Sequence, residues 1–244
     1  MKKHHVIYSL FILILLAALG FSTTACANDS EAQTALRRIA PRVTPQMALV
    51  AETVQLESDS WKLILASEKS PLPDDFTAKV SKLPNGKEFD SRAIDDLEAM
   101  LAAAKADGVS LTVVSSYRSY DYQVGLFKRK VDQYKAKGYN DTDAYNIAKT
   151  IVALPGTSEH NLGLAADIVT PSYMTLDDGF EKTDAFAWLS THCADYGFIL
   201  RYPKDKGDIT GIIYEPWHYR YVGHNAAKEI MAKGICLEEY LGKV

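Results

Sequence analysis

Apolar and polar residues follow the spacing of amphipathic helices along much of the chain. In the segment 91–106 the apolar side chains fall on one helical face and Gly108 follows, which predicts a helix that ends there. Similar patterns predict further helices at 119–137, 141–153, 183–195 and 225–232. Short apolar runs predict strands at 109–115, 164–170, 198–201, 212–214 and 218–222. Helices come first and strands gather later, so we expect an α+β fold with a small antiparallel sheet.

Some helix boundaries have a local chemical signal. Ser119, Asp141 and Thr183 stand where a side chain can cap the N-terminus of a helix. In the helix 119–137 several apolar residues share a face, and we expect them to point inward; they are Val124, Phe127, Val131 and Tyr134. Pro155-Gly156 would end the helix 141–153 and open a loop.

Residues 1–27 are typical of an export leader. Two lysines precede the apolar run 10–21, which is too short to span a bilayer comfortably. Ala25-Cys26-Ala27 fits a signal-peptidase site, so the mature chain would begin at Asn28. Cleavage before Cys26 with lipidation, or an uncleaved anchor, are the alternatives, and all three predict an extracytoplasmic protein. Segment 28–60 is mixed and polar, and we expect a tether or a helical arm ahead of one domain at 61–244.

Composition narrows the class of protein. The 244 residues are 47% hydrophobic, enough for a sizeable core. The formal net charge is -4 and there is no basic stripe, which argues against nucleic-acid binding. Outside the leader the chain has two cysteines, Cys193 and Cys236. Export would permit a disulfide between them, but both lie in apolar surroundings, and we favour two buried thiols.

Candidate chemistry concentrates in two short stretches. The stretch 158–167 contains His160 and Asp167, and Glu215 and His218 follow far downstream. Two imidazoles and a carboxylate are the ligands of a catalytic zinc ion that keeps one position open. Glu215 would then be a general base, or alternatively a fourth ligand, which would close the site. Pro216 bars regular sheet pairing, so a turn can direct Glu215 and His218 toward one centre.

Four stretches together are similar to a known family. They are Ser116-Tyr117-Arg118-Ser119, the motif 155–167, the tract 196–203 and the tract 214–223. They resemble the VanY-like D-alanyl-D-alanine carboxypeptidases, zinc enzymes of bacterial cell-wall metabolism. The resemblance runs from about residue 61 to 241, and it implies that the small antiparallel sheet carries a zinc site and is flanked by helices.

The resemblance also implies roles for individual residues. Arg118 would bind the C-terminal carboxylate of the substrate and stabilise the oxyanion at the scissile carbonyl, since a guanidinium can hold two oxygens at once. Gln123 and Ser158 match positions expected to contact substrate. Asn161 departs from the family, in which glutamine is frequent there, and this puts only local contacts in doubt.

The implied activity is that of a zinc metallocarboxypeptidase that removes the C-terminal D-alanine from peptidoglycan stem peptides. An L,D-carboxypeptidase that trims tetrapeptide stems to tripeptides would use the same zinc ligands, so the motifs do not separate the two. A cell-wall-binding module without catalysis is the third reading. The intact Glu215 argues against it, because a pure binder has no need of a base.

Overall fold

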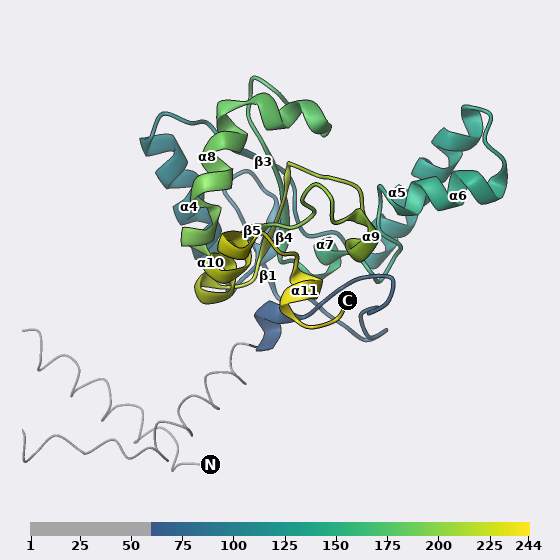
Figure 1. Ribbon diagram of the computed structural model, residues 1–244, viewed down its shortest axis with the longest axis horizontal. Helices are drawn as coiled ribbons and strands as arrows, with labels where there is room; N and C mark the ends of the chain where they lie inside the picture. The colour runs from purple at the N-terminus through teal and green to yellow at the C-terminus, as the bar shows by residue number, and fades with distance from the viewer. Residues whose placement is uncertain (1–59) are drawn as a thin grey trace, which may run out of the picture. The chain divides into compact units, whose positions relative to one another are not determined.

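The computed structural model describes residues 60–244. The predicted leader and almost all of the predicted tether lie outside these residues. Within 60–244, no helix combines the length and the apolar character needed to cross a membrane. Figure 1 shows helices arranged around a central sheet.

The sheet has four antiparallel strands in the order β3 (Thr112–Ser115), β4 (Ala165–Val169), β6 (His218–Tyr221) and β5 (Phe198–Leu200). This confirms the predicted α+β fold. The two faces differ in chemistry because successive side chains of a strand point to opposite sides. Ile168 and Tyr219 belong to the main apolar core, whereas Asp167 and His218 alternate with them and face the other way. One face therefore stabilises the fold and the other carries polar groups.

Helices α4 (Ile94–Ala106) and α8 (Asp184–His192) cover the apolar face. Leu97, Met100 and Leu189 are fully buried there, and burial of such a side chain is worth roughly 1.5–3 kcal/mol. Helix α4 starts three residues later than its pattern predicts, after a turn at 91–93. It is followed by Gly108, whose φ of 80° lets its N–H donate to the carbonyl of Lys105. The predicted helix 183–195 begins at its Thr183 cap and continues as η3 (Cys193–Tyr196).

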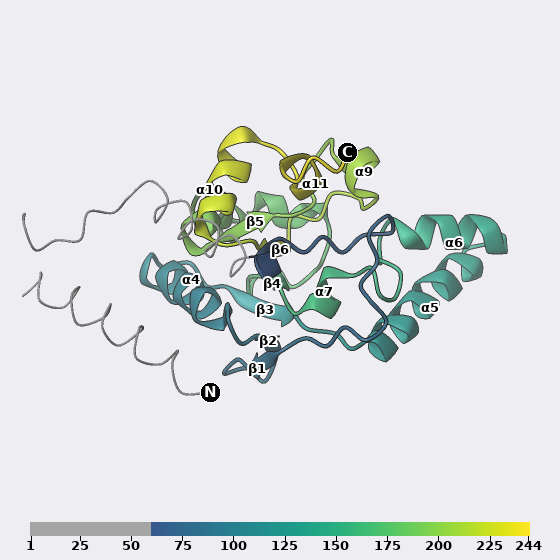
Figure 2. The ribbon, with the colours of Figure 1, turned by 90° about the horizontal axis from the view of Figure 1, so that it is seen from below.

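Helices α5 (Tyr120–Ala136) and α6 (Asp141–Lys149) form a hairpin that projects from the rest of the domain (Figures 1 and 2). Ser119 caps α5 as predicted, while α6 is capped by Asn140 instead of Asp141. The predicted inward face of α5 packs on α6 and not on the core. Phe127 contacts Tyr145 edge-on, and Val124 is 44% exposed.

The predicted strand 212–214 is wrong. Both edges of β6 are already occupied by β4 and β5, and the N–H of Ile213 donates instead to Thr150 at the end of α6. The charged turn before it contains α9 (Gly207–Thr210). A second sheet, which the pattern did not predict, is the hairpin of β1 (Val80–Lys82) and β2 (Glu88–Asp90).

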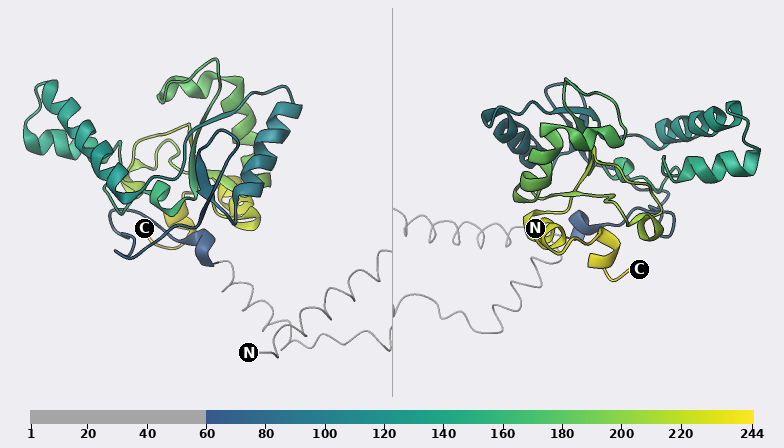
Figure 3. Two further views of the ribbon diagram at one scale, coloured as in Figure 1. Left: turned by 180° about the vertical axis from the view of Figure 1, so that it is seen from behind. Right: turned by 45° about the horizontal axis from the view of Figure 1, so that its top comes forward.

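The remaining elements are helices, and Figure 3 shows the ribbon that contains them from two further sides. They are η1 (Ser60–Leu63), α7 (Glu159–Leu162), η2 (Asp178–Lys182), α10 (His224–Lys233) and α11 (Leu237–Tyr240). Helix α10 forms a smaller apolar cluster with β5, α11 and the start of the domain. Cys193 and Cys236 are both free and buried, which confirms the prediction of two thiols.

Candidate metal centre

Three neighbouring elements bring the predicted ligands together. Asp167 on β4 and His218 on β6 are direct partners across the strand pair, so their side chains lie on the same face. His160 comes from α7, which ends at Gly163. The φ of 78° at Gly163 turns the chain into β4, and a Cβ there would lie 3.1 Å from Val80. A short helix, a glycine turn and a strand thus set the His-x6-Asp spacing.

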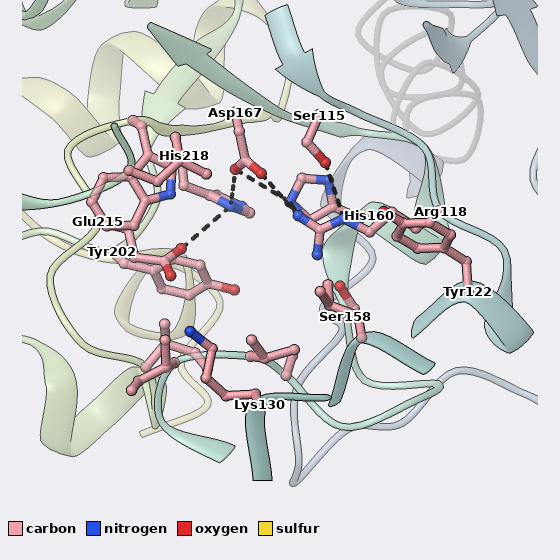
Figure 4. A pocket seen from close by; sticks show the side chains of 17 residues that line it. Ser115, Arg118, Tyr122, Lys130, Ser158, His160, Asp167, Tyr202, Glu215 and His218 are labelled. Carbon is pink, nitrogen blue, oxygen red and sulfur yellow. Dashed lines mark hydrogen bonds and ion pairs between the residues drawn. The ribbon is translucent and has the colours of Figure 1, made fainter. Parts of the chain in front are cut away.

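The ligand atoms converge on one oxygen of Asp167 (Figure 4). His160 Nε2 lies 3.3 Å and His218 Nδ1 lies 3.2 Å from Asp167 Oδ1. One ligand atom from each residue lies within 4.8 Å of the others. Asp167 Oδ1 is buried and accepts no hydrogen bond from the residues 60–244. A buried anionic oxygen between two imidazoles is the arrangement that a cation would satisfy.

The protonation states of His160 and Asp167 suit a metal ion. His160 Nδ1 lies 2.7 Å from the carbonyl of Ser116, which can only accept, so this nitrogen carries the proton. Nε2 keeps the lone pair that a metal ligand needs, and Arg118 Nη2 donates to it at 3.1 Å. Burial, together with nearby Arg118, lowers the pKa of His160 to about 4, which keeps the ring neutral. Burial alone would raise the pKa of Asp167, but the imidazoles and Arg118 outweigh it and hold the pKa well below its usual range.

Glu215 stands at the edge of this group. Its Oε2 lies 3.5 Å from His218 Nδ1, and its side chain is outside the cluster of three ligand atoms. The chain turns here because Glu215 N–H donates to Tyr202 and His218 N–H donates back to the Glu215 carbonyl. Burial, with the nearby Asp167 charge, raises the pKa of Glu215 to about 8. A bound dication would favour its ionised form, and a carboxylate beside an open metal position suits a general base.

Arg118 is held at the same centre. Its Nη2 donates to Asp167 Oδ2 at 2.8 Å, and its Nε donates to Ser115 Oγ at 3.0 Å. Gln123 accepts from Arg118 Nη1 at 3.3 Å and donates to Ala153 at 2.7 Å. Gln123 is fully buried behind Arg118 and does not line the cavity, so the structure gives it the position of a support for Arg118. Its contact with substrate stays a prediction.

A cavity of about 320 Å³ opens over the ligands. Ser158, Glu215 and Arg118 lie in its lining, and contact of Ser158 with substrate stays a prediction. Trp217 and Tyr202 form part of the wall. Lys130 of α5 also reaches this cavity, and it has no ion pair or hydrogen bond within the described part of the chain. The cavity therefore offers cations, a carboxylate base and apolar walls to a small peptide end.

Sequence reasoning missed the residues behind the ligands. Glu159, inside the motif 158–167, is buried and accepts from Arg201 and Arg220, each at 2.7 Å. Its other oxygen, Oε2, lies 3.5 Å from His218 Nε2. The sequence did contain a signal for this cluster, because Arg201 and Arg220 lie in apolar segments predicted as strands. A buried arginine requires a negatively charged partner such as Glu159. Burial lowers the pKa of His218, but Asp167 and Glu159 outweigh it and raise the pKa to about 9, so metal and proton compete for this ring.

Two imidazoles and one carboxylate around an open cavity, with a second carboxylate and an arginine beside them, define a mononuclear zinc hydrolase. The model of the VanY family, described as D-alanyl-D-alanine carboxypeptidase, matches residues 86–224. The D-alanyl-D-alanine carboxypeptidase of Enterococcus faecalis is 44% identical over 189 residues, which cover 77% of this chain and 68% of that protein. The putative carboxypeptidase YodJ of Bacillus subtilis is 45% identical over 175 residues, covering 69% and 58%. The chain belongs to the VanY family of zinc-dependent D-alanyl-D-alanine carboxypeptidases.

Solved structures agree with this assignment. VanYB in complex with D-alanine-D-alanine is 44% identical, with a TM-score of 0.69 over 75% of this chain and 98% of that one. The vancomycin-resistance D,D-pentapeptidase VanY, as a variant in complex with Zn(II), is also 44% identical, with a TM-score of 0.68 over 74% and 99%. The LD-carboxypeptidase LdcB is 38% identical, with a TM-score of 0.64 over 74% and 85%. Zinc is therefore the metal of this family site, and the ligand set of this chain fits it.

Proposed function

We propose that the protein removes the C-terminal D-alanine from peptidoglycan stem peptides that end in D-Ala-D-Ala, with zinc held by His160, Asp167 and His218. The observation that carries this proposal is the buried ligand triad with Glu215 at its edge and Arg118 in the same cavity. Each group has a separate task in peptide hydrolysis, and all of them face one space large enough for a dipeptide end.

Zinc at this site supplies a Lewis acid and an acidified water as nucleophile. Glu215 accepts a proton from the water while the oxygen of the water adds to the scissile carbonyl carbon. Arg118 stabilises the negative charge that develops on the carbonyl oxygen and binds the terminal carboxylate. When the carbon–nitrogen bond breaks, Glu215 passes the proton to the amine of the leaving D-alanine. The carboxylate thus returns to its starting state after each cycle.

Sequence identity favours D,D over L,D activity. The two VanY structures are 44% identical, whereas LdcB is 38%, the L,D-carboxypeptidase DacB of Streptococcus pneumoniae is 35% and the D,D-dipeptidase VanXYg is 30% identical. All of these structures share the fold of this chain, so the stereochemical preference depends on the shape of the cavity and not on the fold. A comparison of pentapeptide and tetrapeptide substrates tests which stereochemistry the enzyme accepts in the residue before the cleaved bond.

We further propose that the protein acts outside the cytoplasmic membrane. Lys2, Lys3, the apolar run and Ala25-Cys26-Ala27 support an export leader, and peptidoglycan is an extracytoplasmic substrate. Lipidation of Cys26 or an uncleaved leader would make the segment 28–60 a membrane tether. Mass measurement of the mature protein from a native bacterial host distinguishes cleavage before Asn28, cleavage before Cys26 and no cleavage.

The activity is tested with the zinc-loaded chain from Asn28 onward. It is incubated separately with a pentapeptide stem ending in D-Ala-D-Ala and with a tetrapeptide stem ending in one D-alanine, and released D-alanine is followed by mass spectrometry. Release from the pentapeptide that stops at the tetrapeptide supports the proposal. Release from the tetrapeptide alone would establish an L,D-carboxypeptidase, and release from neither would contradict a carboxypeptidase role.

A further inference from the structure

Glu159 lies directly behind a metal ligand and makes no contact with the cavity. It is 1% exposed, and it is not among the residues that line the space over the zinc ligands. Its Oε1 accepts from Arg201 Nε and Arg220 Nη1. Its Oε2 and His218 Nε2 face each other at 3.5 Å, and neither has a hydrogen-bond partner in the described chain. Glu159 Oε2 can accept and His218 Nε2 can donate, so these two atoms can form a hydrogen bond with each other.

The two arginines are themselves fixed. Arg201 donates through Nη1 and Nη2 to both oxygens of Glu238 in α11, at 2.8 and 2.6 Å. Arg220 donates to the carbonyls of Tyr221, Lys62 and Ile64 in addition to Glu159. Two cations and two carboxylates make this buried quartet neutral as a whole. These contacts fix both guanidinium groups, and each of the two groups donates one hydrogen bond to Glu159 Oε1.

A buried ion network is a weak source of stability, because apolar residues of similar size stabilise a core about as well. What apolar residues cannot supply is a hydrogen-bond acceptor aimed at a histidine ring. Metal-binding histidines regularly donate their second nitrogen to such an acceptor, which fixes the tautomer and the orientation of the ring. His160 already has one in the Ser116 carbonyl. Among residues 60–244, the acceptor in the equivalent place for His218 is Glu159.

We propose that Glu159 is a positioning residue of the metal centre: its Oε2 accepts a hydrogen bond from His218 Nε2–H and so directs His218 Nδ1 at the metal. A shift of about 0.5 Å brings the pair into ordinary hydrogen-bond range. The quartet with Arg201, Arg220 and Glu238 keeps the carboxylate charged and in place. The two histidines then bind through opposite nitrogens, His160 through Nε2 and His218 through Nδ1. This inference rests on the assignment of His218 as a ligand under the proposed function.

The first test needs no variant. Long-range proton–nitrogen NMR spectra of the zinc-loaded protein, with labelled histidine, report which nitrogen of each ring carries the proton. We expect His160 to be protonated at Nδ1 and His218 at Nε2. A zinc-loaded protein in which His218 is protonated at Nδ1, or binds through Nε2, would overturn the inference.

The second test separates positioning from charge balance. Glu159→Asp keeps the negative charge that the arginines require but draws the carboxylate one methylene away from His218. Zinc affinity, measured by competition with a chelator, should fall by roughly 10- to 100-fold, and the visible spectrum of the cobalt-substituted protein should change. The melting temperature of the metal-free variant should fall less than that of Glu159→Gln, because aspartate keeps the negative charge between the two arginines. Glu159→Gln, which also unbalances the quartet, should lower both zinc affinity and metal-free stability.

Glu239→Gln is the matched control, because Glu239 lies in α11 beside Glu238 but pairs with Lys206 away from the quartet. It should leave zinc affinity unchanged. If Glu159→Asp folds and binds zinc and cobalt like the unmodified protein, the positioning role is wrong while the proposed function stands. If the unmodified protein itself binds no zinc, the proposed function fails first, so the two failures are distinguishable.

Discussion

Replacing Glu215 with glutamine removes the proton acceptor at the edge of the metal centre and preserves the volume of the side chain. Glu215 is only 7% exposed, so a smaller residue would leave a cavity, whereas glutamine fills the same space. The three ligand atoms of His160, Asp167 and His218 do not include Glu215. We therefore expect Glu215→Gln to bind zinc with the affinity of the unmodified protein and to lose turnover.

The expected loss of turnover follows from the interactions that Glu215→Gln leaves intact. Arg118 keeps its hydrogen bonds to Asp167, Ser115 and Gln123, because none of them involves Glu215. Oxyanion stabilisation and metal binding are then retained, and only proton transfer is removed. A positioned general base contributes about 10²- to 10⁴-fold, which corresponds to about 3–5 kcal/mol in the activation free energy. The change should appear in kcat, with KM altered far less.

The assay measures D-alanine released from the pentapeptide stem by both proteins after their zinc content has been matched by elemental analysis. Glu229→Gln is a control of the same chemistry, since Glu229 is an exposed α10 residue paired with Lys233. It should keep full activity. A Glu215→Gln protein with full zinc and undiminished kcat would refute the role of Glu215 as base. A protein that loses zinc would instead identify Glu215 as the fourth ligand.

The remaining predictions concern Arg118, the metal and the two thiols. Arg118→Lys keeps a positive charge but loses the planar guanidinium that donates to Asp167, Ser115 and Gln123. The KM for the stem peptide should therefore rise at least tenfold in initial-rate measurements. An unchanged KM would contradict carboxylate binding by this residue. Removal of zinc by a chelator should abolish hydrolysis and lower the melting temperature, and added zinc should restore both. Burial raises the pKa of Cys193 to about 12 and that of Cys236 to about 11. Neither thiol should therefore react with iodoacetamide at pH 8 until the protein is unfolded, which mass spectrometry of the intact protein measures.

Local signals in the sequence predicted elements whose cause is local. Ser119 and Thr183 cap their helices because a hydroxyl at the N-cap satisfies a free N–H whatever lies elsewhere in the fold. The ligands could be identified for a related reason, because zinc chemistry accepts few side-chain types at few spacings. His160, Asp167 and His218 meet in the structure as that chemistry required.

Features that depend on distant partners were not predictable in this way. The apolar face of α5 is real, but periodicity does not say whether its partner is the core or α6, and here it is α6. The segment 212–214 has strand composition, yet no strand edge is free beside β6. Glu159 lies 42 and 61 positions from Arg201 and Arg220, so its burial among them appears only when the chain is folded.

The hydrogen bonds of Arg220 have a consequence for the order in which parts of the domain fold. Its Nη2 donates to the carbonyls of Lys62 and Ile64, 158 and 156 positions away, while its Nη1 donates to Glu159. Contacts between such distant parts of a chain require closure of a long loop and tend to form slowly. Glu238, which holds Arg201, lies in α11, 37 positions after Arg201. We therefore expect high-affinity zinc uptake to follow the docking of residues 62–64 and of α11 against the two arginines behind His218.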